Sequence, residues 1–400
     1  MKILYLCHRI PYPPNKGDKI RSFNEVRYLA ARHELDLLCL ADDPGDLKYR
    51  ADLEKICNRV AVFPLYPTRA KVRGLLSLAR GGSISAGYFH QRDMQRCCDR
   101  WLQEGDYDAV FCFSSTMAEY LFHAASLAKG SRKVMDFCDV DSDKWLQYAA
   151  ESSAPMSWLY RLENRRLAAF ERRIYREFDH SLLISDAEAE LFREICPEAQ
   201  DVAVIPNGVD YDFFSPEREG ERVLPVDAPN LVFTGAMDYH ANVDGVLWFC
   251  REIWPLLKKD FPPLRFTIVG GKPTPAVLAL AKLDGVAVTG FVDDVRPYYR
   301  DADVCVIPLR LARGVQNKVL EALAMGRAAV VTTKANAGIQ AEDGTHLRLA
   351  DAPEDFAAAV AVLLRDRGQR ERLGENARRF VTERYDWATN MEKFEELLMT

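Results

Sequence analysis

Short apolar runs alternate with longer stretches of helical periodicity along almost the whole chain. This alternation is typical of βαβ units, and runs this apolar are expected to form parallel strands that helices cover on both faces. In the first half, strands are predicted over Lys2–Cys7, Leu35–Ala41, Val60–Leu65, Ala109–Phe113, Lys133–Phe137, Ser181–Ile184 and Val202–Ile205. Helices are predicted over Asp18–Ala31, Thr116–Ala128 and Trp158–Phe178.

A second α/β series follows a break in the pattern. Ile205–Asp210 is a turn cluster, and Phe214–Pro229 has the polar, proline-bearing composition of a linker. Strands are then predicted over Leu231–Thr234, Arg265–Val269, Val286–Val288, Val304–Pro308 and Ala328–Thr332. Helices are predicted over Val243–Leu257, Val315–Met325, Ala352–Leu364, Gln369–Glu383 and Trp387–Leu398.

The two series predict two doubly wound, Rossmann-like domains. Residues 1–206, joined by a final helix in 385–400, form the first domain, and residues 207–384 form the second. Such sheets bind ligands beyond the carboxyl ends of their strands, at the point where the strand order reverses. We therefore expect a cleft between the domains and look for function in the loops that follow strands.

Composition narrows the class of protein. The net charge of −6 argues against nucleic acid as a partner. Five of the ten cysteines lie in apolar runs and no CxxC motif occurs, so reduced structural thiols and a cytoplasmic location are expected. The apolar start of the chain is too short for a signal peptide, and no run of about 18 apolar residues predicts a membrane span.

Two loops have features of anion-binding sites. Gly17 precedes a predicted helix, where a close backbone approach favours an anionic group, although a simple turn explains it as well. In the second domain, a glycine-bearing loop leads into a helix near Val315, with Lys318 in its first turn. Glu321 lies one turn further and could accept hydrogen bonds from a ribose. The alternative is a solvated helix with a Lys–Glu pair. The candidate residues of this segment are Arg310, Gly314, Val315, Gln316, Asn317, Lys318 and Glu321.

Several segments resemble the GT4 glycosyltransferases. Glu321-Ala-Leu-Ala-Met-Gly326 matches the second half of that family's Glu-x7-Glu signature, Ile205–Asp210 its domain-joining segment, and Asp386-Trp387 the start of its crossover helix. Gly314–Glu321, Asp136–Trp145 and Phe233–Asn242 further resemble the sugar transferases of exosortase/PEP-CTERM exopolysaccharide loci.

The resemblance implies a GT-B fold and transfer of a sugar, with retention and without a metal or bound cofactor, from a nucleotide-diphosphate donor of UDP or GDP type. The second domain would bind the donor, and the first a glycan or polyprenyl-diphosphate-linked acceptor in exopolysaccharide or envelope synthesis. Gly235 and the loop Gly290–Asp294, which contains Val292, correspond to donor-contacting segments of the family.

The sequence departs from the family pattern at two places. Arg313 occupies the position of the first signature Glu, which contacts the donor sugar in the family. The Arg and Lys that usually follow the glycine of the second domain's first strand are also missing after Gly235. We therefore expect Arg310, Arg313 and Lys318 to balance the diphosphate charge instead.

The candidate catalytic groups are Asp139, Asp141 and His8 in the first domain and Arg313 in the second. Asp139 and Asp141 follow a predicted strand, and either could orient the acceptor hydroxyl or accept its proton. Their DxD spacing also occurs in metal-binding GT-A transferases, but two α/β series do not fit that fold. His8 follows the first strand, and His240 follows Gly235. The structural alternative for the acidic segment is that Asp143 caps the next helix.

The first domain also contains two basic stretches, 69–80 and 158–178. They could dock on anionic membrane lipid or on a polyprenyl-diphosphate carrier, or be ordinary solvated helix faces. Two other functions remain open: a nucleotide-sugar 2-epimerase of the same fold, and a nucleotide-sugar-binding protein that has lost catalysis. A dinucleotide oxidoreductase is disfavoured because no GxGxxG follows either first strand.

Overall fold

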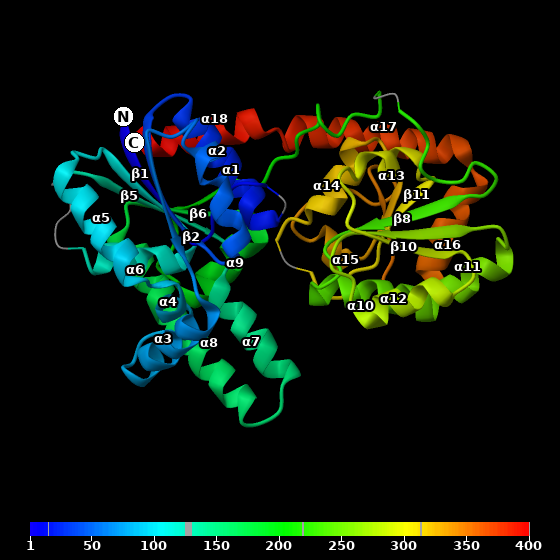
Figure 1. The fold of residues 1–400 in the computed structure, drawn as a ribbon. Coiled ribbons are helices and arrows are strands. Elements are labelled where there is room, and N and C mark those ends of the chain that lie inside the picture. Colours follow the sequence, from blue (N-terminus) through cyan, green and yellow to red (C-terminus); the bar gives the residue numbers. More distant parts are fainter. Residues whose placement is uncertain (15, 125–129, 218–219, 313, 400) are drawn as a thin grey trace. The chain divides into compact units, whose positions relative to one another are not determined.

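The computed structural model describes residues 1–14, 16–124, 130–217, 220–312 and 314–399. The chain folds into two compact units, which are described separately (Figure 1). Unit 1 comprises Met1–Pro206 and Ala388–Thr400, and unit 2 comprises Asn207–Trp387. Each unit contains one parallel sheet with helices packed against it, which confirms the predicted fold class.

Unit 1 contains a seven-stranded sheet in the order β3-β2-β1-β4-β5-β6-β7. Every neighbouring pair is parallel, and Ile3 of β1 lies opposite both Leu35 and Ala109. Because the chain runs outward from β1 in one direction and from β4 in the other, the strand order reverses between β1 and β4. The strands are β1 (Lys2–Cys7), β2 (Glu34–Ala41), β3 (Arg59–Pro64), β4 (Ala109–Phe113), β5 (Arg132–Cys138), β6 (His180–Leu183) and β7 (Val202–Val204).

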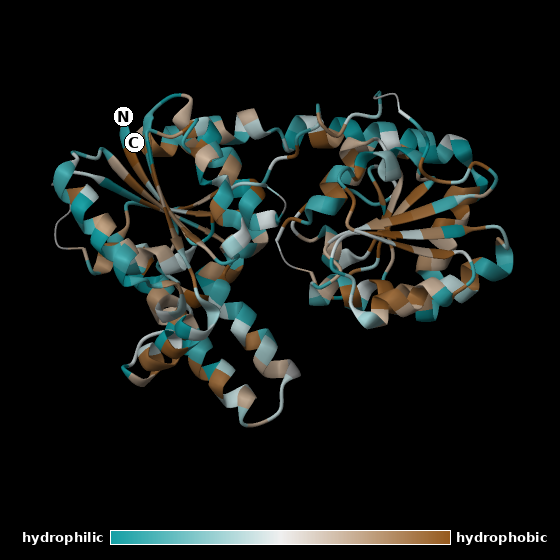
Figure 2. Ribbon diagram, in the orientation of Figure 1, coloured by the Kyte–Doolittle hydropathy of each residue, from teal (hydrophilic) through white to brown (hydrophobic). Residues whose placement is uncertain are grey.

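Alternating strand residues of unit 1 face two different helical layers. Val110 and Cys112 join a core that includes Met94 and Trp101, whereas Phe111 meets Phe394 of the last helix with ring centroids 5.0 Å apart. Figure 2 shows the strands as predominantly hydrophobic segments. The helices are α1 (Gly17–Ala30), α2 (Arg50–Leu53), α3 (Pro67–Ala79), α4 (Ile84–Phe89), α5 (Arg92–Glu104), α6 (Ala118–Phe122), α7 (Asp141–Glu151), α8 (Met156–Glu177), α9 (Asp186–Ile195) and α18 (Trp387–Met399), with 3₁₀ turns over Pro44–Tyr49 and Ser115–Met117.

Unit 2 contains a six-stranded parallel sheet in the order β10-β9-β8-β11-β12-β13, so its strand order reverses between β8 and β11. The strands are β8 (Asn230–Thr234), β9 (Arg265–Val269), β10 (Val286–Gly290), β11 (Val304–Ile307), β12 (Ala329–Val331) and β13 (Arg348–Leu349). The helices are α10 (His240–Trp248), α11 (Trp254–Asp260), α12 (Pro275–Ala279), α13 (Arg296–Asp301), α14 (Asn317–Ala324), α15 (Thr333–Asn336), α16 (Pro353–Arg365) and α17 (Arg367–Arg384). A π-helical turn spans Phe249–Ile253, and a 3₁₀ turn spans Leu280–Lys282.

Two predicted helices differ from the structure, and one strand was missed. The helix expected over Val243–Leu257 is interrupted by the π-helical turn, because Pro255 has no N–H for an uninterrupted α-helix. The helix expected over Thr116–Ala128 is a 3₁₀ turn followed by α6, which ends at Phe122; residues 125–128 lie outside the described residues. The two-residue strand β13 was not predicted, since so short a strand has no recognisable periodicity.

Candidate functional site

The candidate site of unit 2 lies where its strand order reverses. The loop after β8 contains Gly235 and leads into α10, which begins at His240. The loop after β11 leads into α14, which begins at Asn317 with Gln316 as its N-cap residue. The helix therefore starts two residues later than predicted. Two helix N-termini, each a favourable place for an anion, follow adjacent strands here.

Lys318 links these two helices. Its ammonium donates a hydrogen bond to Asn242 Oδ1 at 3.0 Å, and the Asn242 amide donates in turn to the Ala236 carbonyl at 2.9 Å. Burial disfavours the charged lysine and lowers its pKa to about 8, although the nearby Glu321 opposes this shift. A partly buried cation in the first turn of a helix suits an anionic ligand, because its charge is otherwise costly there.

Glu321 has a different partner. Its Oε2 accepts a hydrogen bond of 2.8 Å from the Tyr299 hydroxyl, which also lies 2.5 Å from Thr234 Oγ1. Burial raises the pKa of Glu321, while Tyr299 and Lys318 act in the opposite direction. The side chains of Lys318 and Glu321 are thus anchored by Asn242 and Tyr299. This arrangement differs from the solvated Lys–Glu pair considered as an alternative.

Glycines bring three strand ends of unit 2 close together. A Cβ on Gly270 would lie 1.8 Å from the Gly235 carbonyl oxygen, and the Gly270 φ of 151° also favours glycine. The Met237 N–H donates to the Gly271 carbonyl at 2.9 Å, and the Gly270 N–H donates to the Gly290 carbonyl at 3.1 Å. The loop with half-buried Val292 follows Gly290 directly, so the loops after β8, β9 and β10 adjoin one another.

The remaining candidates of unit 2 are less enclosed. Arg310 is exposed and forms an ion pair with Asp244 of α10, and His240 is exposed at the start of that helix. Gly314 has a φ of 54°, and its carbonyl packs against Gly338. Val315 is buried. Arg313 lies outside the described residues.

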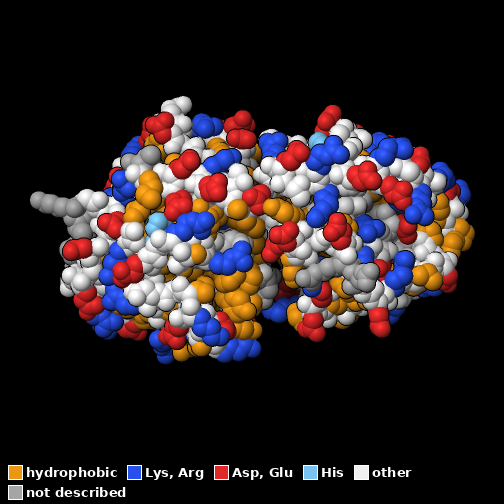
Figure 3. Space-filling model, turned by 90° about the horizontal axis from the view of Figure 1, so that it is seen from above, with side chains coloured by type: hydrophobic (Ala, Val, Ile, Leu, Met, Phe, Trp, Pro, Cys, Tyr) orange, Lys and Arg blue, Asp and Glu red, His pale blue; other side chains and the backbone are white. Residues whose placement is uncertain are grey.

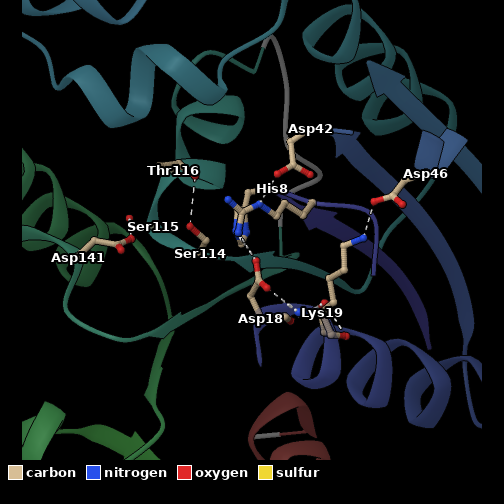
Figure 4. A network of polar contacts seen from close by, with 11 residues as sticks. His8, Asp18, Lys19, Asp42, Asp46, Ser114, Ser115, Thr116 and Asp141 are labelled. Atoms are coloured by element: carbon tan, nitrogen blue, oxygen red, sulfur yellow. Dashed lines mark hydrogen bonds and ion pairs between the residues drawn. The ribbon is translucent and has the colours of Figure 1, made fainter. Parts of the chain in front are cut away.

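The candidate site of unit 1 also lies where its strand order reverses. His8 follows β1, and its Nε2 lies 3.4 Å from the carboxylate of Asp18 in the first turn of α1, next to Gly17 (Figure 4). Arg9 donates to Asp18 at 2.6 Å and lies 2.9 Å from Asp42. Burial would raise the pKa of Asp18, but His8 and Arg9 lower it well below its usual range. The His8 ring stacks on Phe113 at 5.9 Å.

The ends of β4 and β5 contribute the acidic segment. The Ser115 hydroxyl donates to Asp141 Oδ2 at 3.1 Å, which joins the loops after the two strands (Figure 4). Ser114 and Cys138 have φ values of 79° and 61°, a left-handed conformation that turns the chain sharply at both strand ends. Asp139 is half-buried beside Cys138. His8, Ser115, Asp139 and Asp141 therefore share one sheet edge.

The capping role considered for Asp143 is wrong. The N-cap residue of α7 is Val140, and Asp143 lies within the first turn. Two buried carboxyls from other helices accept the backbone N–H groups instead: Glu188 binds Val140 at 2.7 Å, and Glu171 binds Ser142 at 3.1 Å. Burial raises the pKa of Glu171 to about 8 and that of Glu188 to about 7.

Sequence reasoning did not single out several of these residues. Asn242, Tyr299 and Thr234 hold Lys318 and Glu321, and Asp18 and Ser115 hold His8 and Asp141. Ser115 and Asp18 follow strand ends closely enough for the loop-after-strand rule to find them. Tyr299 lies in α13, far along the chain, and no local pattern connects it with Glu321.

Family comparisons match both units. Residues 22–208 match the glycosyl transferase 4-like domain, and residues 228–366 match the glycosyl transferases group 1 domain. The order of the two matches follows the order of the two units, and together they span most of the chain. The chain is a glycosyltransferase built from these two domains. Its two parallel-sheet units have the GT-B fold of its structural neighbours.

Relatives of this glycosyltransferase span its whole length at low identity. A 44.6 kDa protein in cps region of Klebsiella pneumoniae is 22% identical, with 96% of each chain covered. Sucrose-phosphate synthase from Thermosynechococcus elongatus has a TM-score of 0.74 at 16% identity, covering 99% of this chain and 98% of that one. Anabaena HepE, solved in complex with UDP, has a TM-score of 0.68 at 16% identity, covering all of both chains.

The described residues of the glycosyltransferase include neither a cluster of metal ligands nor a membrane-spanning helix. Nowhere in 1–14, 16–124, 130–217, 220–312 and 314–399 do three or more His, Cys, Asp or Glu side chains form a group that could hold a metal ion. The described helices also include none that is long and apolar enough to cross a membrane.

Proposed function

We propose that this glycosyltransferase moves a sugar, with retention of configuration, from a nucleotide-diphosphate donor of UDP or GDP type to a glycan or polyprenyl-linked acceptor. The observation that carries the proposal is the arrangement of Lys318, Asn242 and Glu321 where the strand order of unit 2 reverses. A partly buried cation and two helix N-termini suit a diphosphate. The nearby carboxylate has a free lone pair for ribose hydroxyls.

The neighbouring loops provide the remaining donor contacts in this proposal. Gly235 lets the backbone approach the phosphates, and the loop with Val292 contacts the base. Anabaena HepE, which shares the fold, binds UDP, and this supports a nucleotide donor here. Arg310 exchanges its ion pair with Asp244 for a phosphate contact, and Arg313 and His240 stay candidates for the same charge.

Unit 1 binds the acceptor in this proposal. Asp139, Asp141 or His8 orients the attacking hydroxyl, which forms a bond to the anomeric carbon as the bond to the diphosphate breaks. The hydroxyl proton passes to the departing diphosphate on the same face. The protein contributes positioning and stabilisation of the developing charge, and Lys318 is the principal cation for this role.

The biological setting is part of the proposal. The relative in cps region of Klebsiella pneumoniae supports a role in exopolysaccharide or envelope glycan synthesis. The narrower assignment, to the sugar transferases of exosortase/PEP-CTERM loci, rests on the segments Gly314–Glu321, Asp136–Trp145 and Phe233–Asn242.

Calorimetric titration with UDP, GDP and ADP tests the donor site. We expect one nucleotide to bind, and Glu321→Ala to weaken that binding at least about tenfold because the ribose loses a charged hydrogen-bond partner. Glu375→Ala, an exposed substitution on α17, serves as the control and should bind like the wild type. Equal binding by Glu321→Ala would refute the donor site. Formation of UDP from a UDP-sugar in the absence of acceptor would favour the epimerase. Binding of a nucleotide sugar without any turnover would favour a nucleotide-sugar-binding protein that has lost catalysis.

A further inference from the structure

Four helices of unit 1 form a lobe that projects away from its sheet (Figure 1). The α3–α8 lobe consists of α3, α4, α7 and the first half of α8. Glu163 of α8 accepts hydrogen bonds from Ser83 Oγ at 2.7 Å and from the Ile84 N–H at 2.6 Å, which fixes the start of α4. A Cβ on Gly74 would lie 2.9 Å from the Ile84 carbonyl, so α3 packs tightly on α4. The lobe is a packed substructure rather than a loose extension.

Helix α3 turns an apolar face outward. Its buried residues are Ala70 and Gly74, whereas Val72, Leu75 and Leu76 are 53%, 54% and 49% exposed. Positions 72, 75 and 76 follow the i, i+3, i+4 spacing, so these side chains form one stripe along the helix. A surface helix normally buries such a stripe, and an exposed one marks an interaction site.

The charged side chains of α3 are all cationic. Arg69, Lys71 and Arg80 are exposed on α3 and its C-terminal end, and no Asp or Glu occurs from 55 to 92. None of the three cations forms an ion pair with a carboxylate of the described residues. In contrast, cationic and anionic side chains are interspersed over the face of the molecule drawn in Figure 3.

The end of the α7–α8 hairpin also combines exposed apolar and cationic side chains. Trp158 is 68% exposed at the start of α8, and Leu146, Met156 and Leu162 are exposed near it. Arg161, Arg165 and Arg166 are exposed on the same half of α8. Tryptophan favours the boundary between lipid and water, and arginines pair with lipid phosphates there. Figure 2 shows hydrophobic segments on both helices of this hairpin.

We propose that the α3–α8 lobe docks this protein on the surface of an anionic lipid bilayer, with the α3 stripe inserted among the acyl chains. Helix α3 has 13 residues, which is too short to span a bilayer but sufficient to lie in its interface. The exposed cations Arg69, Lys71 and Arg80 complement anionic headgroups. A protein partner would need acidic groups that match the cations of α3. The lobe presents a projecting face, which suits a bilayer surface, and not a groove that would suit a peptide.

Vesicle co-sedimentation without nucleotide tests this proposal independently of sugar transfer. We expect the full chain to bind vesicles of phosphatidylglycerol and phosphatidylcholine, and to bind phosphatidylcholine vesicles weakly. Rising salt should reduce the binding. The double variant Leu75→Asp/Leu76→Asp should bind at least about tenfold more weakly because two leucines leave the acyl region. Arg69→Glu/Lys71→Glu should lose about tenfold through charge.

Leu278→Asp/Val362→Asp provides the matched control, because both residues are similarly exposed on helices of unit 2. This variant should bind vesicles like the wild type. Circular dichroism and UDP titration of every variant check that both units remain folded. The proposal would be overturned if the wild-type protein does not bind anionic vesicles. It would also be overturned if the α3 variants bind them as tightly as the wild type. A change from dimer to monomer in Leu75→Asp/Leu76→Asp without vesicles would show instead that the stripe contacts a second copy.

Discussion

The Lys318 ammonium donates a 3.0 Å hydrogen bond to Asn242 Oδ1, and this bond joins two helices that begin beside adjacent strands of unit 2. Asn242 belongs to α10 and Lys318 to α14, so the residues are far apart in sequence. Lys318 is the cationic residue of the first turn of α14, and the bond orients its ammonium toward the loop that contains Gly235. It therefore aims a cation at the place where the strand order reverses.

This placement predicts a pH-dependent donor affinity. Because the pKa of Lys318 is lowered to about 8, the free protein loses this charge as the pH rises through 8. An anionic nucleotide favours the protonated form, so binding must take up a proton above that pH. Calorimetry should show constant UDP affinity from about pH 7 to 8 and a progressive fall above it, by up to about tenfold per pH unit.

Two variants separate Lys318 from other causes. Lys318→Met should bind UDP at least about tenfold more weakly at pH 7 and lose the pH dependence. Lys282→Met removes an exposed lysine of the same unit and should keep both the affinity and the pH dependence. A Lys318→Met protein that retains the wild-type pH profile would show that another group titrates.

Gly270 is expected to be essential for the stability of unit 2. In Gly270→Ala the new Cβ would lie 1.8 Å from the Gly235 carbonyl oxygen, so the backbone of β8 or β9 must shift. The free energy of unfolding should fall by about 3 kcal/mol or more. Gly344→Ala is the control: its φ of 77° is also unfavourable for alanine, but no atom lies within 4 Å of the added Cβ. It should cost only about 1 kcal/mol in urea unfolding.

Substitution of His8 should reduce turnover without changing the affinity for the donor nucleotide. His8→Phe keeps the stacking on Phe113 but removes the nitrogen that faces Asp18. If His8 helps to orient the acceptor, UDP release stimulated by a polyprenyl-diphosphate-linked sugar should fall about 100-fold, with unchanged UDP affinity. His123→Phe, in the same unit and exposed, should keep normal turnover. Loss of UDP affinity in His8→Phe would contradict this separation of roles.

Glu171 makes the stability of unit 1 depend on pH. Its folded pKa of about 8 lies above its ordinary value of 4.5, so the folded state binds the proton more tightly. Its contribution to stability is present in full below pH 4.5 and is lost as the pH rises through 8. Glu171→Gln cannot ionise and still accepts the Ser142 N–H. The wild type should lose on the order of 3 kcal/mol relative to Glu171→Gln between about pH 5 and pH 8.

Thermal unfolding across this pH range measures the difference. Glu177→Gln, an exposed substitution at the end of the same helix, should follow the wild type. If Glu171→Gln also follows the wild type, Glu171 is ionised in the folded protein and its pKa is not raised.

The fold class and most of the strands could be predicted from local sequence patterns. Of the thirteen strands in the described part of the chain, twelve were predicted within about two residues, because apolar runs such as Ala109–Phe113 have a strong local signal. The positions of Gly235, Lys318 and Glu321 after strand ends also followed from order along the chain. Local sequence patterns predict an element when the interactions that stabilise it join residues close in sequence.

The hydrogen-bond partners of these residues could not be predicted from the sequence. Asn242 binds Lys318, Tyr299 binds Glu321, and Glu171 replaces Asp143 at the start of α7, each across a long stretch of sequence. The exposure of the α3 stripe could not be predicted either. Periodicity shows that the leucines share one face of the helix, but not whether other elements cover that face. Hydrogen-bond partners and burial depend on which elements the fold brings together, and this information is not local.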